Sequence, residues 1–473
     1  MWIGVVRGYQ LIISMNKTYL CIVIMLLSAS VQAFGSTKST PKRVEVSATS
    51  SFASQVRNTD TYYVIKDVID LKGATITIPK DCTLKMEGGY LTNGTIYGSE
   101  TYIDATPNPV FSSTLQLVGS FVATEAYPEW FDNADDAVKI RKALKQFDNV
   151  KLTALHYVLN SVDTNGYGIV VPEGHILRGN RRANNTKAND QVIKMAEGVN
   201  YTAVVALESS TVLTDLTIWG ANKEYTSCVT TIGEFQSRIT IERVGVSGAY
   251  YGFNLQIYLS NISQCVANYN EVGFYLHGHM EKKNVTVEGT SINLSTCYAV
   301  DSKKAGYELV GITYSTMNNC AADGCGAPTS GTLQYKTEIG YGYSFTQCKC
   351  ITINSCGVEN GLAAVKTMTC RNIVFNTPSF LINKRKDVKV AKDYKMKPIL
   401  NIRYSVCIEF KYMYLYSKGM EKYYTSTTPL MLLYGSDTSL PSVILNNGYE
   451  GLKESNIGTE GFLTKAKHLQ FKQ

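Results

Sequence analysis

The middle of the chain holds several side chains that could transfer protons. Glu271, His277 and Glu308 are candidate acids or bases, and Tyr275 and Lys304 could assist them or neutralise negative charge. Glycoside hydrolysis needs two carboxyl groups, about 5–5.5 Å apart for retention of configuration or about 6.5–9.5 Å apart for inversion. Elimination from a uronide instead needs a base for the C5 proton and a group that neutralises the sugar carboxylate. The residue types permit both reactions.

A histidine pair adds a second kind of chemistry. His277 and His279 alternate along the chain, so on a strand they would lie on one face. Three interpretations stay open: a metal pair whose third ligand is unidentified, a general acid and base, or a plain surface pair. The acidic clusters typical of calcium sites are not evident. We therefore expect no cofactor; calcium is left open, without a clear site.

The elements that must position these residues form a repeat. Short segments with alternating apolar residues begin at Gly252, Gly273, Gly306, Gly342 and Gly361, and the first two lie 21 residues apart. Alternation with a period of two is typical of half-buried strands, and repeats of about 20–50 residues are typical of solenoids. Without helical stretches, such units predict the coils of a parallel β-helix, stacked about 4.8 Å apart.

Cysteines follow the same repeat. Cys265, Cys297, Cys320 and Cys356 fall at equivalent turns, where each would behave as a small buried hydrophobe in an internal stack. Disulfide bridging is the alternative in an exported protein. The cysteine spacings do not make the paired CxxC knuckles of a zinc site.

The composition supports a folded β-protein. Of 473 residues, 44% are hydrophobic and 18% are charged, which excludes a disordered chain and a long coiled coil. The chain has only 11 proline residues but 32 tyrosines, and proline is excluded from the interior of sheets. The formal net charge of +7 is mild and too scattered to indicate nucleic-acid binding.

The first 33 residues have the pattern of a cleavable signal peptide. Met15 resembles a true start, Lys17 supplies a positive charge, residues 19–27 are apolar, and residues 28–33 are small at the cleavage positions. The apolar run is too short to span a membrane. Cleavage would remove Arg7 and Lys17 and no acid, which lowers the charge to +5. We expect a secreted, periplasmic or cell-surface protein without a membrane span.

The segment from residue 127 onward resembles the pectate-lyase-like superfamily, including its tailspike-like and polygalacturonase-like branches. The resemblance rests on residues 127–131 (YPEWF), the Asp135–Asp136 pair with an amphipathic segment after it, residues 168–179 (GIVVPEGHILRG) and residues 210–220 (STVLTDLTIWG). It implies an all-β fold, a right-handed parallel β-helix with a short N-terminal capping helix. The acidic strand motifs of polygalacturonases are absent here.

The resemblance also implies where a substrate would bind. In that superfamily a glycan groove follows one sheet face, and the catalytic groups point outward from the strands that begin with glycine or from the turn before them. For this chain the implied catalytic residues are Glu271, Tyr275, His277, Lys304 and Glu308. The implied substrate-binding residues are Tyr250, Tyr251, Asn254 and Gln256. Ordinary surface residues are the alternative for each of them.

The remaining segments complete the predicted organisation. We expect a flexible leader at 34–60, a small β-module at 61–126 with Gly-Gly and Asn-Gly turns, the β-helix at 127–400, and late coils with a C-terminal cap at 401–473. The basic run 384–397 is either a solvated cap or a contact for an anionic glycan.

The leading functional hypothesis is an exported protein that binds and cleaves a polysaccharide as a lyase or glycoside hydrolase, and the positive net charge permits an anionic polysaccharide. A non-catalytic glycan-binding or adhesion β-helix is the second hypothesis, and a purely structural solenoid is the third. The expected state is a monomer or a homotrimer.

Overall fold

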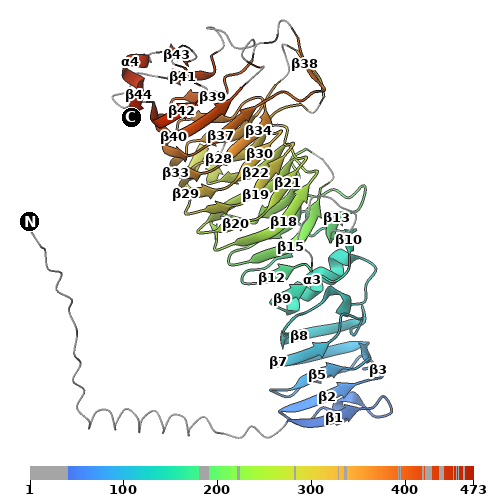
Figure 1. Cartoon of the computed structure of the whole chain (residues 1–473). Coiled ribbons are helices and arrows are strands. Elements are labelled where there is room, and N and C mark those ends of the chain that lie inside the picture. Colours follow the sequence, from blue (N-terminus) through green and yellow to red (C-terminus); the bar gives the residue numbers. More distant parts are fainter. Residues whose placement is uncertain are drawn as a thin grey trace, which may run out of the picture.

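The computed structural model describes residues 41–472 except 181–190, 221–223, 282–283, 329, 335–337, 392–393, 395, 418–419, 421–428, 436–441, 451, 454, 456 and 462–463. The predicted signal peptide lies outside these residues. The described chain forms one long column of stacked coils, with the N-terminal strands at one end and the C-terminal strands at the other (Figure 1).

The N-terminal module is itself built from parallel coils. Its main sheet holds β1 (Lys42–Val46), β2 (Thr61–Ile65), β5 (Thr83–Met86), β7 (Gly94–Ala105), β4 (Thr75–Thr77) and β8 (Leu115–Val122), and a side pair joins β3 (Val68–Asp70) to β6 (Tyr90–Thr92). Its ladders are parallel, so the Gly-Gly and Asn-Gly turns are corners between coils and not hairpin turns. Gly88 (φ +89°) and Asn93 (φ +54°) take the left-handed conformation that such corners require.

The predicted flexible leader does not match the structure: the described residues of that range are folded. Strand β1 pairs in parallel with β2, and the short helix α2 (Phe52–Gln55) buries Phe52. The physical reason is that Val46, Phe52 and Val56 are apolar and nearly fully buried, which ties this Ser/Thr-rich segment to the module core.

A short helical segment connects the module to the main column. The 3₁₀ helix η1 (Pro128–Trp130) is followed by α3 (Asp136–Gln146), whose N-cap Asp135 accepts a hydrogen bond from the Ala137 amide. The Trp130 ring is fully buried against Phe147, with 5.3 Å between ring centres. Isolated parallel bridges between Phe111 and Phe131 and between Ala126 and Val150 continue the pairing across this junction.

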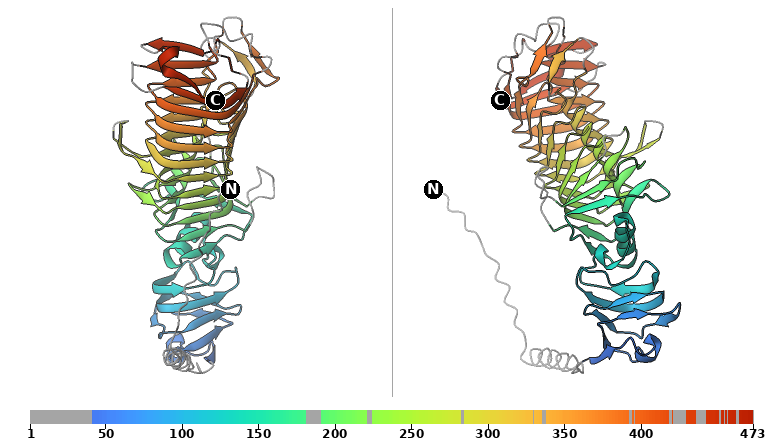
Figure 2. Two further views of the ribbon diagram at one scale, coloured as in Figure 1. Left: turned by 60° about the vertical axis from the view of Figure 1, so that its left-hand side comes forward. Right: turned by 90° about the vertical axis from the view of Figure 1, so that its right-hand side faces the viewer.

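Two long parallel sheets form the main column, which confirms the predicted parallel β-helix (Figure 2). The first, called the broad sheet here, has twenty strands in the described residues: β9 (Asn149–Lys151), β10 (His156–Leu159), β12 (Ile176–Arg178), β13 (Val192–Met195), β15 (Val212–Trp219), β18 (Thr240–Ser247), β20 (Asn261–Ser263), β21 (Val266–Asn268), β25 (Gly289–Thr290), β26 (Asn293–Ser295), β27 (Tyr298–Val300), β29 (Ile312–Asn318), β30 (Ala321–Asp323), β33 (Lys349–Asn354), β34 (Gly357–Gly361), β36 (Arg371–Asn376), β37 (Ser379–Ile382), β40 (Val406–Tyr416), β42 (Val443–Glu450) and β44 (Leu469–Lys472).

The second sheet, called the glycine sheet here, contains the strands that begin beside Gly252, Gly273, Gly306 and Gly342. It comprises β11 (Tyr167–Val171), β14 (Ala203–Leu207), β16 (Ser227–Thr231), β17 (Gln236–Ser237), β19 (Tyr251–Tyr258), β22 (Val272–His277), β28 (Ala305–Val310), β32 (Tyr341–Thr346), β35 (Val365–Met368), β39 (Leu400–Arg403), β41 (Met431–Gly435) and β43 (Ile457–Gly461). Two small pairs stand outside the column, antiparallel β23 (His279–Glu281) with β24 (Asn284–Val287) and parallel β31 (Gly331–Leu333) with β38 (Val388–Val390). The helix α4 (Lys465–His468) precedes the last strand.

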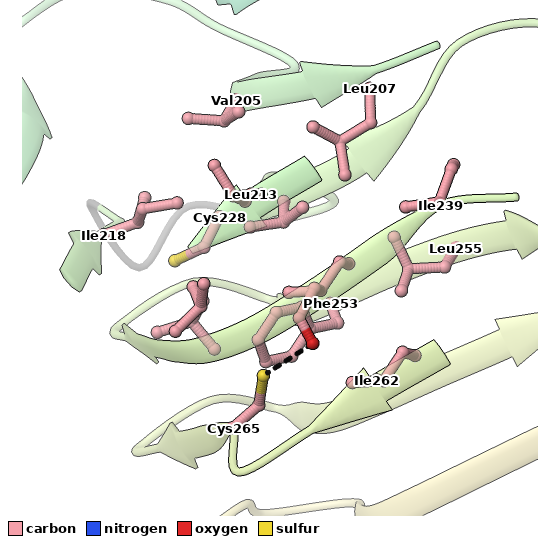
Figure 3. Packing of buried hydrophobic residues seen from close by; sticks show 14 of the residues in the cluster. Val205, Leu207, Leu213, Ile218, Cys228, Ile239, Phe253, Leu255, Ile262 and Cys265 are labelled. Atoms are coloured by element: carbon pink, nitrogen blue, oxygen red, sulfur yellow. Dashed lines mark hydrogen bonds between the residues drawn. The ribbon is translucent and has the colours of Figure 1, made fainter. Parts of the chain in front are cut away.

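The interior of the column is a continuous stack of equivalent side chains. Phe253, Phe274, Tyr307 and Tyr343 lie face to face on successive strands of the glycine sheet, with ring centres 4.8, 4.9 and 5.1 Å apart. Figure 3 shows Phe253 and Leu255 among the buried residues of both sheets, with Cys228 and Cys265 beside them. The alternating apolar residues of these segments therefore point into the core, as a period of two predicts.

The cysteine stack is also confirmed. Cys265, Cys297, Cys320 and Cys356 each follow a paired strand by the same number of residues, and all four are buried. Every described cysteine is a free thiol. The Cys297 thiol donates to the carbonyl oxygen of Ile262 (3.5 Å), so the sulfur atoms fill the core and also satisfy backbone groups.

Candidate functional site

The outward face of the glycine sheet aligns the predicted residues in columns. Strand register places Asn254, Tyr275, Glu308, Ser344 and Lys366 directly beside one another on five consecutive strands. Neighbouring strands in a sheet are about 4.8 Å apart, so these side chains form one continuous polar column. The next column begins with Gln256 and His277, as the alternation predicted.

A strip of aromatic rings follows the same face. The Tyr225 ring stacks on Tyr250 with 5.2 Å between centres, and Tyr250 meets Tyr251 edge to face at 4.6 Å. The strip continues from Tyr251 to Tyr275 at 5.0 Å and from Tyr275 to His277 at 4.8 Å. We call these five rings the aromatic strip. Tyr225 is 67% exposed, so the strip presents a ring face or edge to solvent.

The aromatic strip leads into a cavity of about 420 Å³. Its lining joins three of the predicted catalytic residues to residues from later coils: Glu271, Lys303, Lys304, Ala305, Glu308, Glu338, Ile339, Gly340, Tyr341, Ser344, Lys366 and Lys397. The ammonium group of Lys304 donates to the Tyr250 hydroxyl (2.6 Å) and so joins the strip to the cavity. Tyr250, Tyr251, Tyr275, His277, Asn254 and Gln256 lie on the face beside the cavity and do not line it.

Glu308 is the unpaired acid of this cavity. It is half-buried and forms no hydrogen bond or ion pair with any described residue. Burial raises the pKa of Glu308, and the nearby ammonium groups of Lys366 and Lys304 oppose that shift. A carboxyl group in a cavity can act as a general acid when protonated and as a general base when ionised.

The phenols beside Glu308 remain protonated. Burial raises the pKa of Tyr251 to about 12, and the charges of Tyr250 and Glu308 contribute. Burial also raises the pKa of Tyr275, and the Glu308 carboxylate adds to the shift. Tyr275 neighbours Glu308 in strand register, so an acid and a neutral phenol donor stand side by side.

The other acids and lysines of the cavity differ in whether their charged groups have a partner. Glu271 is held by the ammonium group of Lys303 at 2.6 Å, whereas Lys366 forms no ion pair with a described residue. Lys397 donates to the carbonyl oxygen of Ile339 (3.0 Å). Burial lowers the pKa of Lys397, Glu338 opposes the shift, and the positive charges of Lys366 and Arg403 lower it further. The cavity therefore holds more positive charge than its acids neutralise.

The two predicted histidines have different surroundings. Nδ1 of His277 donates to the Gly278 carbonyl oxygen (2.8 Å), Nε2 lies 3.2 Å from Asn254 Oδ1, and burial lowers the pKa of His277. His279 lies 3.4 Å from a Glu234 carboxylate oxygen and 3.5 Å from the Gln256 amide nitrogen. The pair therefore does not converge on one point.

In the ranges that the structure describes, no group of three or more His, Cys, Asp or Glu side chains could hold a metal ion. Among those same residues, no helix combines the length and the apolar character needed to cross a bilayer.

Several residues of the site did not follow from the sequence, among them Tyr225, Glu338, Lys366 and Lys397. Tyr225 lies in a turn outside the repeat pattern, and Glu338 and Lys397 lie in long connections. Lys366 was missed because Gly361 was aligned with the glycines that begin each strand, which was wrong: Tyr343 pairs with Val365, so Ala364 occupies the place of Gly342. The corrected register would have placed Lys366 in the Glu308 column.

No protein-family model matches the sequence, and a search of the curated proteins finds no significant match. Solved structures with a similar chain path include a tailspike of Acinetobacter phage vb_AbaP_AS12, at 11% identity and a TM-score of 0.47 over 74% of this chain and 61% of that one. The enzymatically active domain of tailspike protein 2 of bacteriophage CBA120 has 12% identity and a TM-score of 0.41, over 73% of this chain and 46% of that chain. The A-module of the Azotobacter vinelandii mannuronan C-5 epimerase AlgE6 has 16% identity and a TM-score of 0.41, over 72% and 95% of the two chains. The chain covers less than two thirds of each of these tailspike chains.

Proposed function

We propose that this exported protein binds an acidic polysaccharide along the glycine sheet and cleaves it in the cavity around Glu308. The single observation that carries the proposal is the position of Glu308, an unpaired acid in a cavity with four lysines at the end of the aromatic strip. Flat aromatic faces suit sugar rings, and unpaired ammonium groups suit carboxylate substituents on those rings.

Elimination is the reaction that this set of residues supports best. In that reaction Glu308 takes the C5 proton of a uronide, the C4–O bond breaks, and a C4–C5 double bond forms. Tyr275, which neighbours Glu308 and keeps its proton, supplies a proton to the leaving oxygen. Lys304, Lys366 and Lys397 neutralise the sugar carboxylate, whose charge increases as the proton leaves.

Hydrolysis has weaker support from the same residues. It requires a second carboxyl group free to act as nucleophile or base. Glu271 already forms an ion pair with Lys303, and Glu338 is an exposed residue of the cavity lining.

Binding without cleavage is the second candidate function. It is favoured by the absence of a second carboxylate in the column of described residues that contains Glu308. In this case the same lysines and aromatic rings would hold an acidic glycan without turning it over, as an adhesion protein does.

One experiment separates these functions. The mature protein is incubated with alginate, polygalacturonate and neutral dextran, and unsaturated uronides, new reducing ends and binding are measured in parallel. Unsaturated products from an acidic polymer support elimination, reducing ends without unsaturation identify a hydrolase, and binding alone identifies an adhesin. The absence of all three signals would overturn the proposal for these glycans. Glu359→Gln, which alters an exposed acid on the broad sheet, is the matched control for Glu308→Gln.

A further inference from the structure

Two long connections, with one coil between them, form a lobe beside the cavity. The described residues of 324–340 and 383–399 leave the column at the same corner, and β31 pairs with β38 within them (Figure 1). Together with the corner residues of neighbouring coils they enclose a hydrophobic cluster separate from the main core: Ala327, Leu333, Ile339, Tyr341, Leu362, Ala363, Val388, Tyr394, Met396 and Met420. The lobe therefore has a packed core and is not a loose loop.

The lobe covers one corner of the coils that is exposed to solvent on earlier coils. Strand register places Tyr250, Glu271, Lys304, Gly340 and Leu362 at the same corner of five successive coils. Tyr250 and Glu271 are partly exposed and Lys304 is exposed, but Leu362 is fully buried beneath the lobe. A chain that follows this corner toward the C-terminal coils meets the lobe after Lys304.

The neighbouring polar column, which contains Glu308, becomes buried one coil later. After Glu308, Ser344 and Lys366, the next residue in register is Asn401, which is only 6% exposed. Its amide nitrogen donates to the Tyr341 hydroxyl (2.9 Å), and Tyr341 belongs to both the cavity lining and the lobe cluster. The hydrogen bond from Lys397 to the Ile339 carbonyl oxygen joins the two connections of the lobe beside this position.

An ion pair anchors the lobe to the column. Arg385, in the second connection, pairs with Asp301, which lies in the turn after β27. The Asp301 side chain is only 8% exposed, so water screens this pair weakly. The pair therefore ties the second connection of the lobe to the turn after β27.

We propose that the lobe closes the substrate groove at its C-terminal end. The cavity then receives the terminal unit of an acidic glycan, and the protein acts from a chain end. This inference rests on the proposed function and adds where on the polymer the protein acts. The aromatic strip extends from the cavity toward earlier coils only, so the rest of the glycan lies over Tyr250 and Tyr225. The lobe stops the chain beyond the Glu308 position.

The number of chain ends tests the inference. Polygalacturonate and alginate are each fragmented to about a tenth of their mean length and compared with the intact polymer at equal mass. We expect about tenfold more binding sites per unit mass after fragmentation and, if the protein cleaves, short products of one size from the first time point. Binding sites per mass that do not depend on length, or a broad range of early products, would overturn it. No binding at any length would overturn the proposed function, and this inference with it.

Release of the lobe provides the second test. Arg385→Met removes the anchor, and we expect several-fold more binding sites on the intact polymer or a broader range of products. Lys349→Met, which removes an exposed ion pair with Glu288 on the broad sheet, is the matched control and should change neither quantity. If Arg385→Met does not fold, Asp301→Asn weakens the same pair from the other side. A folded variant that still binds only chain ends would show that the lobe does not stop the chain.

Discussion

The ammonium group of Lys304 lies 2.6 Å from the hydroxyl oxygen of Tyr250 and 4.5 Å from the centre of its ring, although the two residues are two coils apart. The hydrogen bond raises the pKa of Lys304, so this lysine stays charged at the point where the aromatic strip meets the cavity. Aromatic and cationic recognition are therefore coupled in one contact.

Substitutions of Tyr250 should separate the ring from its hydroxyl group. Tyr250→Ala removes both, and we expect glycan affinity to fall by about 0.5–1.5 kcal/mol, or roughly 2–12-fold in Kd. Tyr250→Phe keeps the ring and should lose less. Isothermal titration with the best-binding acidic polymer measures both variants. Equal affinity for wild type and Tyr250→Ala would remove the aromatic strip from the binding surface.

Replacement of Glu308 should stop cleavage and leave the fold intact. Because Glu308→Gln cannot exchange a proton, we expect turnover to fall by about 10²–10⁴-fold while glycan affinity changes little. Initial rates and circular dichroism provide the two readouts. Loss of turnover in the control Glu359→Gln would mean that the effect is not specific to the cavity.

The same variant should alter how stability depends on pH. The folded pKa of Glu308 lies above its ordinary value of 4.5, so its contribution is present below pH 4.5 and is lost as the pH rises through the folded pKa. Glu308→Gln removes this loss, and we expect a higher Tm than wild type at neutral pH and a smaller difference in acid. Thermal melts of both proteins from acid to neutral pH test this prediction. A lower Tm for Glu308→Gln than for wild type at neutral pH would contradict it.

His277 should have the opposite pH dependence. Burial holds its folded pKa below 6.5, so its contribution to stability is present above pH 6.5 and is lost as the pH falls through the folded pKa. We expect the acid-induced decrease in Tm to be smaller in His277→Gln than in wild type. The general acid–base role of His277 stays a prediction, and the pH–rate profile of His277→Gln tests it.

The thiols should differ sharply in reactivity. Cys350 and Cys407 are partly exposed, whereas the other nine described cysteines are buried. Burial raises the pKa of Cys228 and of Cys325 to about 12, which keeps both as unreactive thiols. We expect native alkylation to label Cys350 and Cys407 and the rest only after unfolding, as mass spectrometry can measure. Native labelling of Cys297 or Cys320 would contradict the internal stack.

Local patterns in the sequence predicted the column well. Period-two alternation predicted half-buried strands, and Phe253, Phe274, Tyr307 and Tyr343 form the buried face of those strands in the structure. The prediction works because a strand places alternate side chains on opposite faces whatever its neighbours are. Those same alternations placed Tyr275 and Glu308 outside and adjacent. The prediction went wrong at Gly361, because a glycine alone does not mark where a strand begins.

The sequence by itself determined the β-helix, the cysteine stack and the outward column with Glu308, since each depends on alternation and repetition along the chain. Only the tertiary structure decided which lysines surround Glu308 and where the groove ends. Lys397 and Glu338 reach the cavity from connections that carry no periodic pattern, and the lobe forms only when segments about 60 residues apart, such as those that contain β31 and β38, pack together. Contacts between such segments depend on how the coils stack, which local spacing cannot encode.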